Sequence, residues 1–143
     1  MTSFHQFHLN LLKLGYNNLI KQPGFNQDDS QEEAPYSVEA DELLALFQET
    51  ITLYQEHDDE AFNLGQSLMM RIVRNYPQYT QLLARDLLWL FGGDCIHYLA
   101  DEEVVEFQAL DEARYAKEAQ NEAYDYLTLR NSVIGAPASA EQH

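Results

Sequence analysis

Residues 82–103 decide the fold, and they read LLARDLLWLFGGDCIHYLADEE. The only Trp of the chain, Trp89, lies in an apolar run that closes at the glycine pair 92–93. An apolar run with helical spacing, followed by glycines that can adopt left-handed conformations, predicts a buried helix and a sharp reversal. Asp101 is expected to cap the next helix, with two glutamates behind it that favour the positive end of the helix dipole.

On the N-terminal side of this stretch, apolar residues at helical spacing predict further helices. Together with the apolar run they give four: about residues 4–19, 37–54, 60–76 and 79–91. Pro77 marks a boundary between the last two. Gly15 lies on the apolar stripe of the first helix, so a second helix is expected to approach closely there. Residues 21–36 are polar and contain proline, glycine and acids, which predicts a loop.

On the C-terminal side, no Gly or Pro interrupts the chain between Asp101 and about Arg130. One helix over this stretch would be roughly 45 Å long, whereas a compact chain of this size has a radius of gyration of roughly 14–15 Å. The helix must therefore span the molecule, bend or protrude. The predicted fold is all-α: a single-domain bundle of about five helices over residues 1–130. Its fourth helix is central and apolar, its C-terminal helix is long, and residues 131–143 form a disordered tail.

Composition narrows the classes of partner. Apolar residues make up 45% of the 143 residues, enough for a real core. The formal net charge is −16, from 24 acidic and 8 basic side chains. Such a surface repels nucleic acid and anionic membranes and favours a basic protein surface as partner. A single Cys, no signal-like N-terminus and no long apolar run favour the cytoplasm and argue against a membrane span.

The candidate functional cluster consists of Arg85, Asp94, Cys95 and His97, which gather around the reversal. Carboxylate, thiolate and imidazole are all zinc ligands, but a structural zinc site needs four, and no further Cys or His pair lies nearby. On a helix, His97 would point away from Cys95 and could not act as its base. No metal, cofactor or catalytic residue is therefore predicted. In the alternative interpretation, Asp94 caps a turn, Cys95 packs as a small apolar residue and His97 makes a local hydrogen bond.

Other motifs give no clearer chemistry. The glycine pair lacks the Lys-Ser/Thr of a phosphate-binding loop, and the chain contains no Glu-x-x-His for a di-metal bundle. Three arginines in apolar helices, at positions 71, 74 and 85, are expected to reach carboxylates of neighbouring helices. Aromatic residues could wall a small-molecule pocket, although their helical spacing favours core packing. They are Phe47, Tyr54, Tyr76, Tyr79, Trp89, Phe91, Tyr98 and Phe107.

The run over residues 85–103, with Leu110-Asp-Glu112 after it, resembles an uncharacterised family of small, acidic, all-helical proteobacterial proteins. The resemblance covers mainly residues 76–115. It implies a helical protein from a bacterium and carries over no catalytic residue.

Taken together, the sequence favours a cytoplasmic, non-enzymatic module for protein binding or regulation, with the long C-terminal helix as a route to a homo-oligomer. The alternative is a small-ligand-binding protein or an enzyme with its site near Arg85, Asp94, Cys95 and His97. That alternative requires these side chains to converge on a cavity where the fourth and fifth helices meet.

Overall fold

A computed structural model describes residues 1–25 and 38–135, and within these ranges the chain forms eight helical segments and no strand. They are α1 (Phe4–Leu19), α2 (Val38–Gln55), α3 (Glu60–Asn75), η1 (Pro77–Leu82), α4 (Arg85–Phe91), η2 (Gly93–Tyr98), α5 (Asp101–Ala119) and α6 (Tyr126–Val133). The all-α prediction is confirmed, but the expected number of about five helices is too small. Most of the predicted loop 21–36 and residues 136–143 of the predicted tail lie outside the described residues, and residues 131–133 belong to α6.

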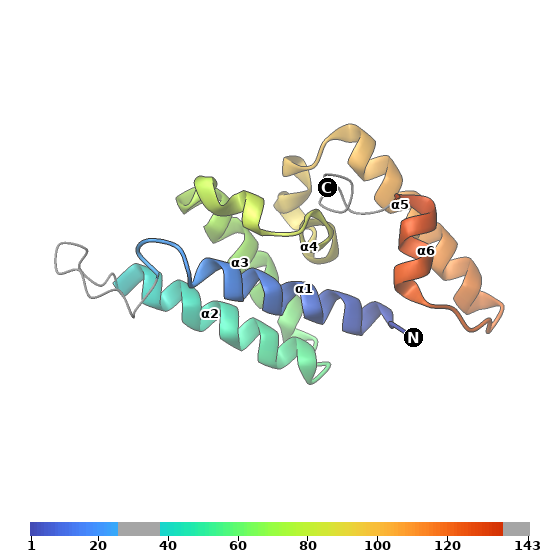
Figure 1. The fold of residues 1–143 in the computed structure, drawn as a ribbon, viewed down its shortest axis with the longest axis horizontal. Coiled ribbons are helices and arrows are strands. Elements are labelled where there is room, and N and C mark those ends of the chain that lie inside the picture. Colours follow the sequence, from blue (N-terminus) through green and yellow to red (C-terminus); the bar gives the residue numbers. More distant parts are fainter. Residues whose placement is uncertain (26–37, 136–143) are drawn as a thin grey trace.

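Helices α1, α2 and α3 form an apolar body in which α1 and α2 run antiparallel side by side (Figure 1). Its centre is fully buried and includes Leu12, Phe47 and Leu68. Gly15 of α1 permits the close approach that its position predicts, since a Cβ there would lie 3.3 Å from Cζ of Phe47 on α2. Helix α3 ends just before Pro77, as expected.

The helix predicted over residues 79–91 is in fact two segments, the 3₁₀ turn η1 and the shorter helix α4. Leu83 and Ala84 separate them in extended conformations, with ψ of 133° and 140°. The extended step places the Leu83 side chain in the core, a tertiary constraint that helical periodicity does not register. Helix α4 then contacts α1, α3 and α5, with Leu87 and Leu88 fully buried.

The reversal after α4 forms at Gly92 and Gly93, each with φ of +64°, as the glycine pair predicts. The predicted N-cap of the next helix is wrong. Ala100, not Asp101, is the N-cap of α5, and Asp101 is its first helical residue. The Glu103 carboxylate accepts the Ala100 N–H at 2.8 Å, so it takes over part of the capping.

The long C-terminal helix is also a wrong prediction, because α5 stops at Ala119. Asn121 adopts φ of +53°, and its N–H donates to the Glu118 carbonyl at 3.1 Å. The next N–H, of Glu122, donates to the Lys117 carbonyl at 3.0 Å, which completes a Schellman ending. Asp125 then caps α6 by accepting the Thr128 N–H at 2.9 Å.

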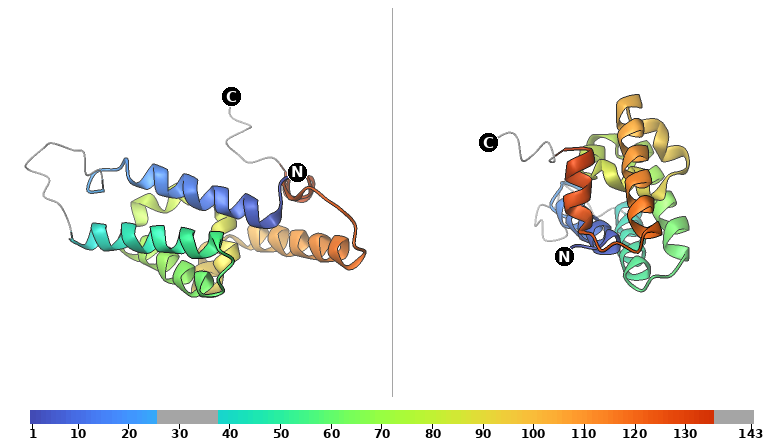
Figure 2. Two further views of the ribbon diagram at one scale, coloured as in Figure 1. Left: turned by 90° about the horizontal axis from the view of Figure 1, so that it is seen from below. Right: turned by 90° about the vertical axis from the view of Figure 1, so that its right-hand side faces the viewer.

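Helices α5 and α6 thus form a hairpin that extends beyond the α2–α3 pair and folds back to the start of α1 (Figure 2). The Tyr126 N–H donates to the Thr2 carbonyl at 2.7 Å, and the Thr2 N–H donates to the Asp125 carboxylate. The hairpin therefore contacts both α1 and α4. None of the described helices combines the length and the hydropathy that a membrane crossing requires.

Candidate functional site

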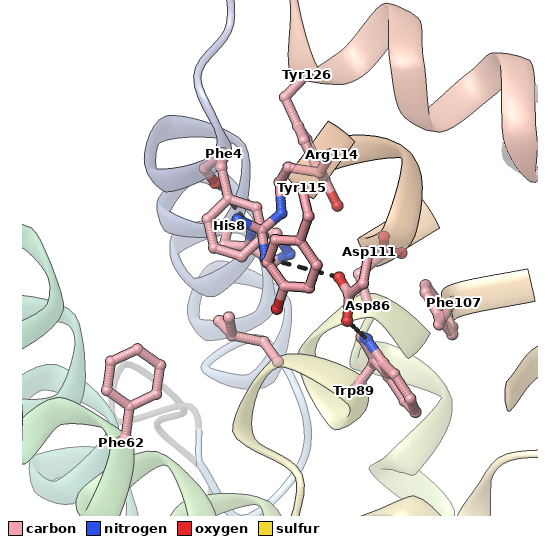
Figure 3. Close-up of a pocket in the computed structure, with 11 residues that line it drawn as sticks. Phe4, His8, Phe62, Asp86, Trp89, Phe107, Asp111, Arg114, Tyr115 and Tyr126 are labelled. Atoms are coloured by element: carbon pink, nitrogen blue, oxygen red, sulfur yellow. Dashed lines mark hydrogen bonds and ion pairs between the residues drawn. The ribbon is translucent and has the colours of Figure 1, made fainter. Parts of the chain in front are cut away.

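A cavity of about 290 Å³ lies between α1, α4 and the α5–α6 hairpin, with one residue of α3 at its edge (Figure 3). Its lining is mostly aromatic and charged. It comprises Phe4, His8, Phe62, Asp86, Trp89, Leu90, Phe107, Asp111, Arg114, Tyr115 and Tyr126. Aromatic walls with a few convergent polar groups are typical of small-molecule sites, although the volume is at the small end of their range.

The aromatic side chains hold one another in place. Phe4 meets the edge of Tyr126, with ring centroids 5.1 Å apart, so the first turn of α1 is joined to α6. Trp89 stacks on Phe107 at 5.8 Å, which joins α4 to α5. Phe62 and Tyr115 remain 41% and 56% exposed, so the rim of the cavity presents apolar surface to solvent.

The polar wall is centred on Asp111 and Arg114, one turn apart on α5 (Figure 3). The Asp111 carboxylate accepts the Trp89 indole N–H at 2.9 Å and lies 3.7 Å from Nη2 of Arg114. The guanidinium rests over the Phe4 ring, 4.1 Å from its centroid. Nη1 donates to Glu118 at 3.4 Å. Within residues 1–25 and 38–135, Nε of Arg114 is the one buried side-chain nitrogen or oxygen without a hydrogen-bond partner.

Asp86 also lines the cavity, but its charge is fully paired. Arg130 of α6 donates two hydrogen bonds to the Asp86 carboxylate, from Nε at 2.9 Å and from Nη2 at 3.0 Å. The remaining Nη1 of Arg130 donates to the Asn131 side chain and to the Gly135 carbonyl. Both members of this pair are buried, and each charge has its partner.

His8 contributes a neutral imidazole. Its Nδ1–H donates to the Phe4 carbonyl at 2.8 Å, which leaves Nε2 as an acceptor. Burial lowers the pKa of His8 to about 4, and the bond to Phe4 only partly opposes this effect. Burial, and then the nearby charges of Asp86 and Asp111, raise the pKa of Tyr126 well above its ordinary value. The Tyr126 hydroxyl therefore remains a proton donor at neutral pH.

The lining contains no serine, threonine, cysteine or lysine that could act as a nucleophile. A histidine with a pKa of about 4 is a weak base at neutral pH. Among the described residues, no three His, Cys, Asp or Glu side chains come together as they would around a metal ion.

The four residues of the candidate cluster do not converge on this cavity, and none of them lines it. Arg85 instead binds Glu103 of α5 through Nε and Nη2, both at 2.9 Å, and donates to the Tyr98 carbonyl at 2.7 Å. The bond to Glu103 raises the pKa of Arg85. The prediction that Arg85 reaches a carboxylate of a neighbouring helix is therefore confirmed, and its role is to join α4 to α5.

Cys95 is fully buried, and burial together with the Asp94 charge raises the pKa of its thiol. A protonated, enclosed thiol matches the interpretation of Cys95 as a small apolar residue. Asp94 and His97 are exposed, and Asp94 borders a separate surface groove beside Arg71 and Arg74. Those two arginines form no hydrogen bond or ion pair with any described residue, contrary to the expectation for them.

Sequence reasoning missed most of the cavity. Trp89 and Phe107 belong to the aromatic residues that could wall a pocket, but the remaining lining residues are scattered from position 4 to position 126. One local signal was available: Arg114 is one of only two basic residues, with Lys117, in a mostly acidic helix, and it lies on the same face as Asp111.

A family model described as PA2817-like matches residues 1–143, so the chain belongs to the PA2817-like family. This agrees with the resemblance carried by residues 76–115. Comparison with curated proteins and with solved structures gave no match.

Proposed function

We propose that this member of the PA2817-like family is a non-enzymatic, cytoplasmic binding protein that takes a small planar ligand in the cavity between α1, α4, α5 and α6. One observation carries the proposal: an aromatic cavity contains a guanidinium whose buried Nε–H has no acceptor in the described protein. A buried donor without an acceptor costs free energy, and a ligand that supplies the acceptor recovers it.

The chain contains its own reporter for this site. Trp89 is the only Trp, and its indole N–H faces Asp111 at the cavity wall. A ¹H–¹⁵N spectrum therefore contains a single indole cross-peak, which reports directly on the cavity. Titration with a panel of two-ring aromatic compounds is expected to shift this peak saturably for at least one of them.

A matched pair of variants localises the effect. Leu90→Phe adds a ring inside the cavity, whereas Leu14→Phe makes the same change at an exposed position of α1. Ligand binding should weaken by about tenfold or more in Leu90→Phe and stay unchanged in Leu14→Phe. Equal affinity in both variants would place the ligand elsewhere and contradict the proposal.

Protein binding is the second candidate, and the outer face of α5 favours it. Val105 is 63% exposed there, beside the exposed carboxylates of Glu102, Glu106 and Glu112. This combination fits a basic protein surface that also offers an apolar contact, or a second copy of this chain if charge is screened.

The test replaces the three glutamates on α5 with glutamine and compares that variant with Glu42→Gln/Glu49→Gln/Glu56→Gln, a matched set of exposed acids on and just after α2. A partner of the α5 face is lost only with the first set, and its retention on immobilised protein falls as salt rises. Equal loss with both sets would indicate general charge attraction rather than a specific face.

A further inference from the structure

We infer that the ligand of the cavity is an aromatic monocarboxylate whose carboxylate binds the Nε/Nη2 edge of Arg114. This inference rests on the proposed function, because it names the chemical class of ligand for the same cavity. It is carried by a comparison of three arginines in the C-terminal part of the molecule: two bind a carboxylate through the Nε/Nη2 edge of the guanidinium, and the third, Arg114, does not.

Arg85 and Arg130 use the same edge of the guanidinium. Each presents Nε and Nη2 to one carboxylate, with distances of 2.9 Å and 2.9 Å to Glu103 and of 2.9 Å and 3.0 Å to Asp86. This two-pronged geometry is the one in which arginine binds a carboxylate most strongly. In both arginines the Nε and Nη2 donors are therefore satisfied by a carboxylate of the protein itself.

In Arg114 the corresponding edge makes no hydrogen bond. Nε has no acceptor, and Nη2 lies 3.7 Å from Asp111, which is too long for a hydrogen bond. Asp111 is held away by the Trp89 indole, to which it is bonded at 2.9 Å. The side chain of Arg114 is only 15% exposed and its Nε is buried, so an acceptor reaches this edge only when the side chains around it move. A planar carboxylate from a ligand would complete this edge with the same pair of hydrogen bonds that Glu103 makes with Arg85.

The aromatic walls define the rest of the ligand. Trp89 and Phe107 present stacked rings on one side, and Tyr115 and Phe62 border the opening. A cavity of about 290 Å³ exceeds the roughly 150 Å³ at which an apolar protein cavity accepts benzene, so a fused two-ring system is a suitable size. Rings of this kind stack favourably on aromatic side chains.

The charges in the wall limit the ligand to a single negative charge. Asp86 is neutralised by Arg130, but Asp111 and Glu118 both lie within 4 Å of Arg114. His8 is uncharged at neutral pH and adds no positive charge to the site. With Arg114 these two carboxylates already sum to one negative charge, so they oppose a monoanion and oppose a dianion such as a phosphate monoester more strongly. The two hydrogen bonds from the guanidinium edge must outweigh this repulsion for the monocarboxylate to bind.

The test uses 2-naphthoate, its neutral analogue 2-naphthamide and the dianionic 2-naphthyl phosphate, with the Trp89 indole cross-peak as readout. In the wild-type protein, naphthoate is expected to bind about tenfold more tightly than either of the other two. Arg114→Met should remove that preference and leave the naphthamide affinity within about twofold of its original value. Arg85→Met is the matched control, and there the preference should remain.

The outcomes separate the two proposals. If naphthamide or the phosphate binds as tightly as naphthoate, the carboxylate inference is overturned and the cavity function stands. If no compound shifts the Trp89 peak, the proposed function fails as well. A preference that survives Arg114→Met overturns the assignment to Arg114. If Arg114→Met does not fold, Arg114→Lys keeps the charge without the two-pronged edge, and it should also lose most of the preference for naphthoate.

Discussion

The α1–α3 body and the α4–α6 end share one apolar core, but among the described residues only the second region also contains ion pairs. Every ion pair between described residues lies within the stretch from Arg85 to Arg130, and none joins α1, α2 and α3. The body relies on buried apolar side chains, among them Leu12 and Phe47. Apolar side chains pack closely and leave few voids, whereas an ion pair between two helices fixes their separation by the length of its side chains. The cavity lies where the two regions meet, and ion-paired residues of the α4–α6 end form part of its lining.

The largest expected effect comes from breaking the pair that closes this end. Arg130→Met leaves the Asp86 carboxylate buried without its partner, which should lower the free energy of unfolding by about 3–5 kcal/mol. Denaturant unfolding followed by circular dichroism measures the change.

The double variant Asp86→Leu/Arg130→Met serves as the control for this prediction. It removes both charges and should be clearly more stable than Arg130→Met alone. A cost below about 1 kcal/mol for Arg130→Met would show that apolar packing also holds the α4–α6 end.

The next effect tests packing where the body meets α4. A Cβ at Gly65 of α3 would overlap the ring of Phe91, which is only 3% exposed and has little room to move. Gly65→Ala should therefore cost roughly 2–3 kcal/mol, measured by thermal or denaturant unfolding.

Gly15→Ala is the matched control inside the body, because its Cβ would lie 3.3 Å from Phe47. The gain in helix propensity offsets that milder contact, so the change should stay within about 1 kcal/mol of zero. Equal costs at Gly15 and Gly65 would argue that the two regions are packed alike.

A smaller effect is expected from pH. His8 has a folded-state pKa of about 4 and an ordinary value of 6.5, so the unfolded chain binds its proton first as pH falls. Stability is therefore lost below pH 6.5, by about 1.5 kcal/mol between pH 6.5 and 5. In His8→Phe this part of the pH dependence should disappear. An unchanged pH profile would show that His8 is not enclosed in the folded protein.

The smallest expected change in stability is that of Arg114→Met, which compares Arg114 with Arg130. Arg114→Met removes a guanidinium whose Nε/Nη2 edge makes no hydrogen bond, so it should change the free energy of unfolding by less than about 1 kcal/mol. The same denaturant experiment as for Arg130→Met measures it. A cost comparable to that of Arg130→Met would mean that Arg114 is a structural residue, and the ligand inference would lose its basis.

Local signals in the sequence predicted the fold well where one residue decides the backbone. Pro77 is such a position, because its ring fixes φ and it has no backbone N–H to continue a helix. The pair Gly92-Gly93 is another, because the positive φ of both residues is readily adopted only by glycine. Asn121 decides the backbone in the same way, since it ends α5 in a left-handed conformation. The absence of Gly and Pro does not predict this ending, because asparagine also adopts the left-handed conformation.

The cavity could not be predicted from local sequence patterns, because its walls come from distant parts of the chain. Trp89 was expected to be buried in the bundle centre, but it is half-buried and lines a cavity whose other walls come from both ends of the described chain. Whether an arginine finds a carboxylate depends on helix placement: Arg85 reaches Glu103, whereas Arg71 and Arg74 stay exposed. No spacing rule encodes that difference.

The contact between Thr2 and the start of α6 has a kinetic consequence. It joins residues 123 positions apart through Asp125, so it closes one of the largest loops that the chain can form. Contacts of such sequence separation form late in folding, after the local helices and the α1–α3 body. The cavity, whose walls include Phe4 and Tyr126, should therefore be absent from early folding intermediates and appear only with the final docking step.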